Sequence, residues 1–114
     1  AATKTLALSH GTWRGIEVGG YEIHHGVCRS LEDAEAFLDG VHVGPVWGTM
    51  WHGAFEHDEF RRTWLADAAR HAGSSWRPHS DELGYQARRE AMIETLADAL
   101  EAHVDVDRIL HLVR

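Results

Sequence analysis

One residue whose sequence setting would suit a base is His52. It follows an apolar, strand-like stretch that ends at Trp51, and it precedes Gly53 and a helical pattern. Because glycine lets a chain turn sharply, this order places the imidazole at the rigid end of a strand. A base held in this way, within about 2.6–3.2 Å of a thiol, favours the reactive thiolate. The other reading of His52 is a surface residue at a strand end.

The ten histidines of the chain also suggest a metal-binding module. His24, His25, His52 and His57 are the residues that could approach one another, and imidazole is a good ligand for zinc or nickel. However, no pair of histidines lies four residues apart in a well-predicted helix, and no His-Glu-x-x-His segment occurs. We therefore assign no metal ligands and keep a His-rich metal-binding module as an alternative function.

Cys28 is the only cysteine, so the chain has no internal disulfide, which fits a reducing, cytoplasmic setting. Arg29 follows it directly, and no glycine comes next to it. A base within hydrogen-bond reach of its thiol is conjecture. We interpret Cys28 as a structural or incidental residue.

Alternating apolar and polar residues predict strands in the first half of the chain. The expected strands are residues 3–8, residues 16–25 interrupted by Gly19-Gly20, and residues 41–51 with a bend at Gly44-Pro45 before a strand over 46–51. The first two can pair as a hairpin across residues 10–15. Helical spacing of Leu31, Ala34, Phe37 and Leu38 predicts a short helix over 30–38.

Helical periodicity dominates the second half. A first helix is expected after Gly53, with Asp58 as N-cap and Gly73 as its stop. Its apolar face consists of Phe60, Trp64, Leu65, Ala68 and Ala69. Three tryptophans are expected in the core, namely Trp47, Trp51 and Trp64. A second helix follows a loop over 74–80, capped by Ser80 or Asp81, with an apolar stripe of Met92, Ile93, Leu96, Ala97, Leu100 and Val104 expected to pack on the sheet. Asp105 is expected to cap a last short helix, with Val106, Ile109, Leu110 and Val113 facing inward.

Composition limits the possible functions. The chain has 114 residues and a net charge of −7 without a run of lysines or arginines, which argues against nucleic-acid binding. Its longest apolar stretches are far shorter than the about 20 residues of a membrane-spanning helix. The few predicted strands would leave exposed sheet edges, so the chain is expected to be a piece of a larger sheet or to need a partner. A non-catalytic interaction module is therefore a second alternative, and a homo-oligomer is possible.

Two segments carry a resemblance to a known family. The first is Gly-Tyr-Glu-Ile-His-His-Gly over residues 20–26, preceded by Gly-Thr-Trp-Arg-Gly over residues 11–15. The second is Gly-Thr-Met-Trp-His-Gly-Ala-Phe-Glu over residues 48–56, which runs on to Phe60-Arg61-Arg62. In order and spacing, these segments resemble the C-terminal part of the glutamine amidotransferase domain of cobyric acid synthases, across nearly the whole chain.

The resemblance implies a fold, a reaction and a set of site residues. The fold is α/β: residues 1–114 would be the C-terminal portion of a single flavodoxin-like class I amidotransferase domain, with few strands in a mixed sheet and C-terminal helices. The domain hydrolyses glutamine with a cysteine–histidine pair, and His52 matches the catalytic histidine. Tyr21, Glu22 and His24 would lie near the same cleft and contact substrate. The ammonia would pass to a synthetase part that uses ATP and magnesium to amidate adenosylcobyrinic acid a,c-diamide in cobalamin biosynthesis.

The chain departs from the family in one important respect. The nucleophile of the family lies upstream, in a Gly-x-Cys-Gly-Gly elbow, and nothing in this chain has that context. The chain alone is therefore expected to be inactive. It is expected to be a fragment, either an expressed piece or a natural cleavage or truncation product, and its Ala1-Ala2 start agrees with that. Its expected partners are the upstream nucleophile and synthetase parts of the same enzyme. Many class I amidotransferases carry a glutamate two residues after the histidine; here that residue is Ala54, which agrees with the cobyric acid synthase group. We interpret Glu56, the nearest acidic residue, as a charge at the N-terminus of a helix. Glu22 could orient His52, but we favour its interpretation as a hydrogen-bonded strand residue.

Overall fold

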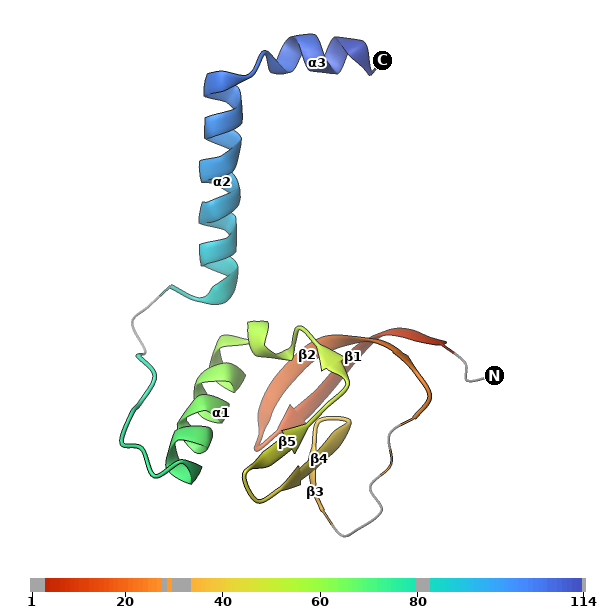
Figure 1. The fold of residues 1–114 in the computed structure, drawn as a ribbon, viewed down its shortest axis with the longest axis vertical. Coiled ribbons are helices and arrows are strands. Elements are labelled where there is room, and N and C mark those ends of the chain that lie inside the picture. The colour runs from red at the N-terminus through yellow and green to blue at the C-terminus, as the bar shows by residue number, and fades with distance from the viewer. Residues whose placement is uncertain (1–3, 28, 30–33, 80–82, 114) are drawn as a thin grey trace. The chain divides into compact units, whose positions relative to one another are not determined.

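The computed structural model describes residues 4–27, 29, 34–79 and 83–113. The chain divides into two compact units, Ala1–Ser80 and Asp81–Arg114 (Figure 1). The elements of the first unit are β1 (Lys4–Trp13), β2 (Ile16–His25), β3 (Glu35–Phe37), β4 (Gly40–Val43), β5 (Val46–Gly48), β6 (Trp51–His52), the 3₁₀ helix η1 (Ala54–Glu56) and α1 (Asp58–His71). The elements of the second unit are α2 (Tyr85–His103) and α3 (Val106–Leu112).

The predicted N-terminal hairpin is confirmed, with longer strands and a shorter turn than expected. β1 and β2 pair antiparallel from Lys4 opposite His25 to Trp13 opposite Ile16. Arg14 and Gly15 form the turn with φ values of 52° and 79°. Two residues with positive φ match the twist of a hairpin, so the polar residues before the turn can join the ladder. The glycine pair in β2 does not interrupt the strand.

A second antiparallel sheet has the order β3-β4-β5. The predicted helix over 30–38 is wrong for Glu35–Phe37, which form β3; residues 30–33 lie outside the described part of the chain. Phe37 is 1% exposed, and its burial together with the pairing of β3 on β4 outweighs a weak helical spacing. The expected bend at Gly44-Pro45 is present as the turn between β4 and β5.

The predicted strand over 46–51 is divided between two sheets. β5 pairs with β4 in the second sheet, whereas β6 pairs with β2 in the first, whose order is β1-β2-β6. All strand pairs of the described residues are antiparallel, so the expected mixed sheet is wrong for this part of the chain. These strands are joined by short connections, which suit antiparallel pairs, whereas parallel strands need a long crossover. The combination of strands and helices is as predicted.

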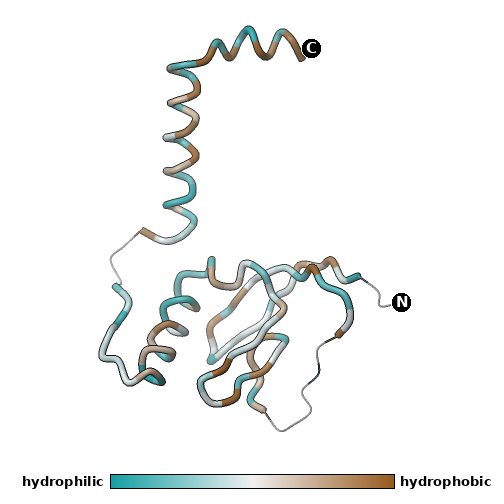
Figure 2. Tube along the Cα trace, in the orientation of Figure 1, coloured by the Kyte–Doolittle hydropathy of each residue, from teal (hydrophilic) through white to brown (hydrophobic). Residues whose placement is uncertain are grey.

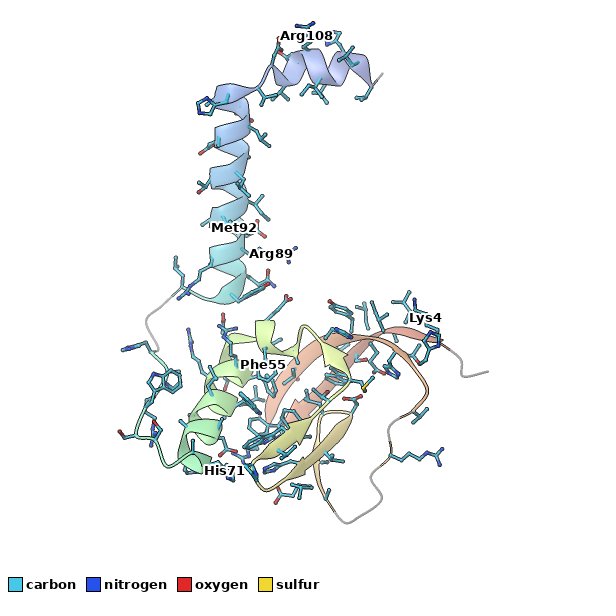
Figure 3. The ribbon with its side chains drawn as sticks, viewed as in Figure 1. Lys4, Phe55, His71, Arg89, Met92 and Arg108 are labelled. Atoms are coloured by element: carbon cyan, nitrogen blue, oxygen red, sulfur yellow. The ribbon has the colours of Figure 1, made fainter. Side chains whose placement is uncertain are left out.

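The core is built on three aromatic rings from three elements. Trp13 of β1, Phe37 of β3 and Phe60 of α1 have ring centroids 5.5–6.0 Å apart and are nearly fully buried. Val18 and Ala54 complete this core, and the predicted core tryptophans pack around it, namely Trp47, Trp51 and Trp64. Phe55 of η1 packs at the edge, 5.3 Å from Phe60 (Figure 3). The cluster therefore holds both sheets and α1 together.

Helix α1 begins and ends close to the predicted residues. Its N-cap is His57, one residue before the expected Asp58. The carboxylate of Asp58 instead pairs with Arg61 in the first turn of the helix. Gly73 has φ of 68°, and its amide bonds to the carbonyl of Arg70 while that of Ser74 bonds to Ala69, which is the Schellman arrangement. The glycine stop is thus confirmed.

Asp67 lies off the predicted apolar face of α1 but is buried, with an exposure of 2%. Its Oδ2 is 3.1 Å from the guanidinium of Arg14, in the turn of the hairpin, and Arg70 also pairs with it. Burial of a charge is tolerated when an opposite charge compensates it. The ion pair therefore ties α1 to the tip of the first sheet.

Both predicted C-terminal helices are present in the second unit. Asp105 caps α3, accepting a bond of 3.0 Å from the amide of Arg108, as expected. The expected caps of α2 at residues 80 and 81 lie outside the described residues, and the helix begins at Tyr85 after Gly84. Apolar and polar residues alternate along α2 (Figure 2), and its large apolar side chains, such as Met92, are exposed, as are those of α3. Packing of the α2 stripe on the sheet stays a prediction.

No helix in the described ranges combines the length and the apolar character that crossing a membrane requires.

Replacement of Phe60 tests the aromatic core. Phe60→Ala is expected to lower the free energy of unfolding of the first unit by about 3–5 kcal/mol, because it removes a fully buried ring and leaves a cavity. Phe55→Ala is the matched control, since that ring is 40% exposed and its loss is expected to have a much smaller effect. Urea unfolding followed by tryptophan fluorescence measures both, and equal losses would contradict the assigned core.

Candidate active site

His52 lies at the end of a short edge strand. It is the second and last residue of β6, which pairs antiparallel with β2 so that His52 stands opposite Tyr21 and Trp51 opposite Glu22. His52 is exposed. The predicted order of strand, histidine, glycine and helix is present, with η1 and α1 following.

The ring of His52 stacks on the ring of Tyr21. Their centroids are 5.2 Å apart and their planes differ by 14°. Gly53 has φ of 76°, which turns the chain away directly after the histidine, and the amide of Glu56 bonds back to its carbonyl at 2.9 Å. A β-carbon on Gly53 would lie 3.4 Å from the Tyr21 ring, so the turn, the tyrosine and the histidine form one compact group.

The four residues predicted for the site fall on two faces of the first sheet. Successive side chains of a strand point to opposite faces, so Tyr21 and its partner His52 share one face, while Glu22 and His24 share the other. Tyr21 is therefore brought to His52, and Glu22 and His24 are not. Of the two readings of Glu22, the hydrogen-bonded strand residue is the one that its contacts support.

Glu22 belongs to a hydrogen-bond network with Ser9 and His24. The hydroxyl of Ser9 donates to one carboxylate oxygen at 2.5 Å, and Nε2 of His24 lies 2.8 Å from the other. Nδ1 of His24 lies 3.1 Å from the carbonyl oxygen of Gly26. Ser9 was not predicted as a site residue, because the first strand was expected to end at Leu8; continued alternation places this serine on the face of Glu22.

The network changes the acidity of the carboxylate. Two hydrogen bonds, the larger contribution from the hydroxyl of Ser9 and the smaller from His24, hold the pKa of Glu22 below its usual value of 4.5. The partial burial of the side chain opposes this effect. The carboxylate is thus charged at neutral pH, where it anchors the inner face of β2 behind the pair of Tyr21 and His52.

A glycine in β2 allows β6 to approach. A β-carbon on Gly20 would lie only 2.7 Å from the carbonyl oxygen of His52 and 3.4 Å from Cβ of Trp51. Contacts below 3.0 Å with backbone cannot be accommodated without movement. The position of His52 therefore depends on the absence of a side chain at residue 20.

The alternative of a metal centre finds no support in the described ranges. They contain no group of three or more His, Cys, Asp or Glu side chains that could hold a metal ion. His24 lies within hydrogen-bond distance of Glu22, and His52 stacks on Tyr21. Cys28, interpreted as structural or incidental, lies outside the described residues.

Gly20→Ala tests the close approach of β6. The added methyl group is expected to displace the backbone of His52 and to lower the stability by about 1–3 kcal/mol. Gly19→Ala is the matched control, because its β-carbon would meet only the flexible ring of His10, at 3.4 Å. Thermal unfolding and the NMR signals of the His52 ring report the two effects, and similar spectra for both variants would argue against the displacement.

Glu22→Gln tests the charge of the network. A lowered folded-state pKa contributes stability that is present above the usual value of 4.5 and is lost as the pH falls through the folded-state pKa. The variant is therefore expected to be less stable than the original chain at neutral pH, and the two are expected to converge at about pH 2. Urea unfolding at both pH values measures the difference. The exposed Glu17→Gln is the control, and a deficit that does not depend on pH would contradict this account.

Comparison with known proteins identifies relatives. Cobyric acid synthases of Mycobacterium sp. (strain KMS), Mycolicibacterium gilvum and Streptomyces coelicolor are 46%, 42% and 44% identical to the chain over 114, 111 and 110 residues. These matches cover 96–99% of the chain but only 21–22% of each relative, so the chain spans about a fifth of their length. No family model matches the chain, and no solved structure does. The predicted resemblance is therefore confirmed: over nearly its whole length, the chain is related in sequence to one segment of the cobyric acid synthases.

Proposed function

We propose that this chain supplies the general base of the glutaminase site of a cobyric acid synthase-like enzyme. The observation that carries the proposal is the placement of His52, an exposed imidazole at the end of β6 that stacks on Tyr21. The relation to cobyric acid synthases supports it. The reaction is the hydrolysis of glutamine to glutamate and ammonia.

In the proposed reaction, His52 transfers protons for a cysteine that lies outside the 114 residues. The imidazole takes the thiol proton, and the thiolate forms a bond to the side-chain amide carbon of glutamine. The carbon–nitrogen bond then breaks, and the imidazolium returns its proton to the leaving ammonia. Water, deprotonated by His52, hydrolyses the thioester, which releases glutamate and the thiol.

Tyr21 is the substrate-contacting residue that this proposal retains beside His52. Its ring covers one side of the imidazole, which restricts the orientation of the ring. Glu22 and His24 are proposed to support the site from the opposite face of β2, through their network with Ser9. A substrate contact of these two residues would require an approach to the inner face of the sheet.

The open face of the first sheet offers a surface for the missing part of the site. Alternation places Leu6, Leu8, Tyr21 and Ile23 on the face of His52, and all four are exposed, Leu8 by 82%. Apolar surface of this extent on one sheet face is typical of an interaction site. We propose that the nucleophile-bearing part of the enzyme covers this face, and that the whole forms a flavodoxin-like amidotransferase domain. Without that part, the chain is expected to be inactive.

The remaining steps belong to other parts of the proposed enzyme. Its synthetase part would use ATP and magnesium to amidate corrinoid carboxylates with the ammonia, as the relation to cobyric acid synthases suggests. The residues described in this chain do not fit a magnesium ion, because no suitable group of carboxylates is brought together. We assign no step of the amidation to this chain.

A hybrid enzyme tests the proposal. The matching 110 residues of the Streptomyces coelicolor protein are replaced by this chain, and glutamate release from glutamine is measured. His52→Asn in the hybrid is expected to lower kcat by about 10²–10⁴-fold, because the general base is lost. The exposed His79→Asn is the matched control and is expected to retain activity. Glutaminase activity that survives in His52→Asn would overturn the proposal.

A further inference from the structure

The two sheets of the first unit are joined by a connection of two residues, Thr49 and Met50. It leaves the second sheet at Gly48, the end of β5, and enters the first at Trp51, the start of β6. A connection of this length can follow several paths unless bonds restrain it. Its path decides where β6 begins and therefore where His52 lies.

Asp39 holds this connection from the neighbouring turn. It lies between β3 and β4, and its Oδ1 accepts a hydrogen bond from the hydroxyl of Thr49 and a second, of 3.1 Å, from the amide of Met50. The hydroxyl of Thr49 in turn accepts a bond of 3.1 Å from the amide of Trp51. The chain of bonds thus leads from a carboxylate to the residue that precedes His52. Bonds that involve an ionised acceptor are stronger than neutral ones.

Close packing of glycine leaves this region little freedom. A β-carbon on Gly40, next to Asp39, would lie 2.0 Å from the carbonyl oxygen of Gly48 and 3.2 Å from Cα of Thr49. At the other end of the connection, a β-carbon on Gly20 would lie 2.7 Å from the carbonyl oxygen of His52. The connection is therefore held at Gly48 by packing, at Thr49 and Met50 by Asp39, and at His52 by β2.

We propose that Asp39 is a positioning residue for His52, acting through Thr49 and the backbone of Trp51. The catalytic part of this inference rests on the proposed function, in which His52 is the base. A misplacement of about 1 Å in such a base is costly, because proton transfer requires a defined distance and direction. Asp39 itself is exposed and contributes little to the core, which separates positioning from general stability.

Substitutions of Thr49 in this chain test the positioning without any enzyme assay. Thr49→Val removes the hydroxyl at nearly constant shape and is expected to speed hydrogen exchange of the Trp51 amide by about fivefold and to shift the NMR signals of the His52 ring. Thr49→Ser keeps a hydroxyl at this position and is expected to show the Trp51 exchange rate and the His52 ring signals of the original chain. Thr95→Val in α2 is the matched control, because it removes the bond from a threonine hydroxyl to the carbonyl of Ala91.

Asp39→Ala is the second variant, and it serves also if Thr49→Val does not fold. In the hybrid synthase, Thr49→Val and Asp39→Ala are expected to lower kcat by about tenfold or more while KM changes less than about twofold. His52 signals that stay unchanged in both variants, or a Thr49→Ser chain that behaves like Thr49→Val, would overturn the positioning. An active His52→Asn hybrid would instead end the proposed function, and the signals of the His52 ring in this chain would still decide the role of Asp39.

Discussion

The first unit depends on the contact of three rings, Trp13, Phe37 and Phe60. Each comes from a different element, and each is nearly removed from water. Burial of such large apolar surfaces is the main source of stability in a small unit. Because the rings join the two sheets and α1, they also fix the distance that the connection after β5 has to cross. The two-residue strand β6 depends on this packing for its position.

The two faces of the first sheet differ in their residues and in their exposure. The inner face carries the core and the network of Ser9, Glu22 and His24, which is hydrogen-bonded and half-buried. The outer face carries His52, its stacking partner Tyr21 and exposed leucines. An exposed imidazole beside an apolar surface agrees with the proposed function, in which the nucleophile-bearing part would cover this surface.

Glycine has a specific structural role around His52. Gly53 turns the chain with a positive φ, and Gly20 and Gly40 allow backbone contacts that a β-carbon would block. The turn at Gly53 follows from the His-Gly step in the sequence. The role of Gly20 does not, because the approach of β6 is a property of the tertiary structure and leaves no local signal; by itself, the glycine pair in β2 predicted an interruption of the strand.

The amino-acid sequence alone determined the hairpin, the two later helices, the end of α1 at Gly73 and the position of His52 between a strand and a turn. These features arise from local patterns, such as alternation, helical period and glycine, which act over a few residues. The tertiary structure decided that residues 35–37 form a strand, that the stretch from Val46 to His52 serves two sheets, and that Tyr21 meets His52 while Glu22 and His24 face inward. These outcomes depend on which surfaces are buried against one another and on strand register, and both are settled by contacts between residues far apart in the chain.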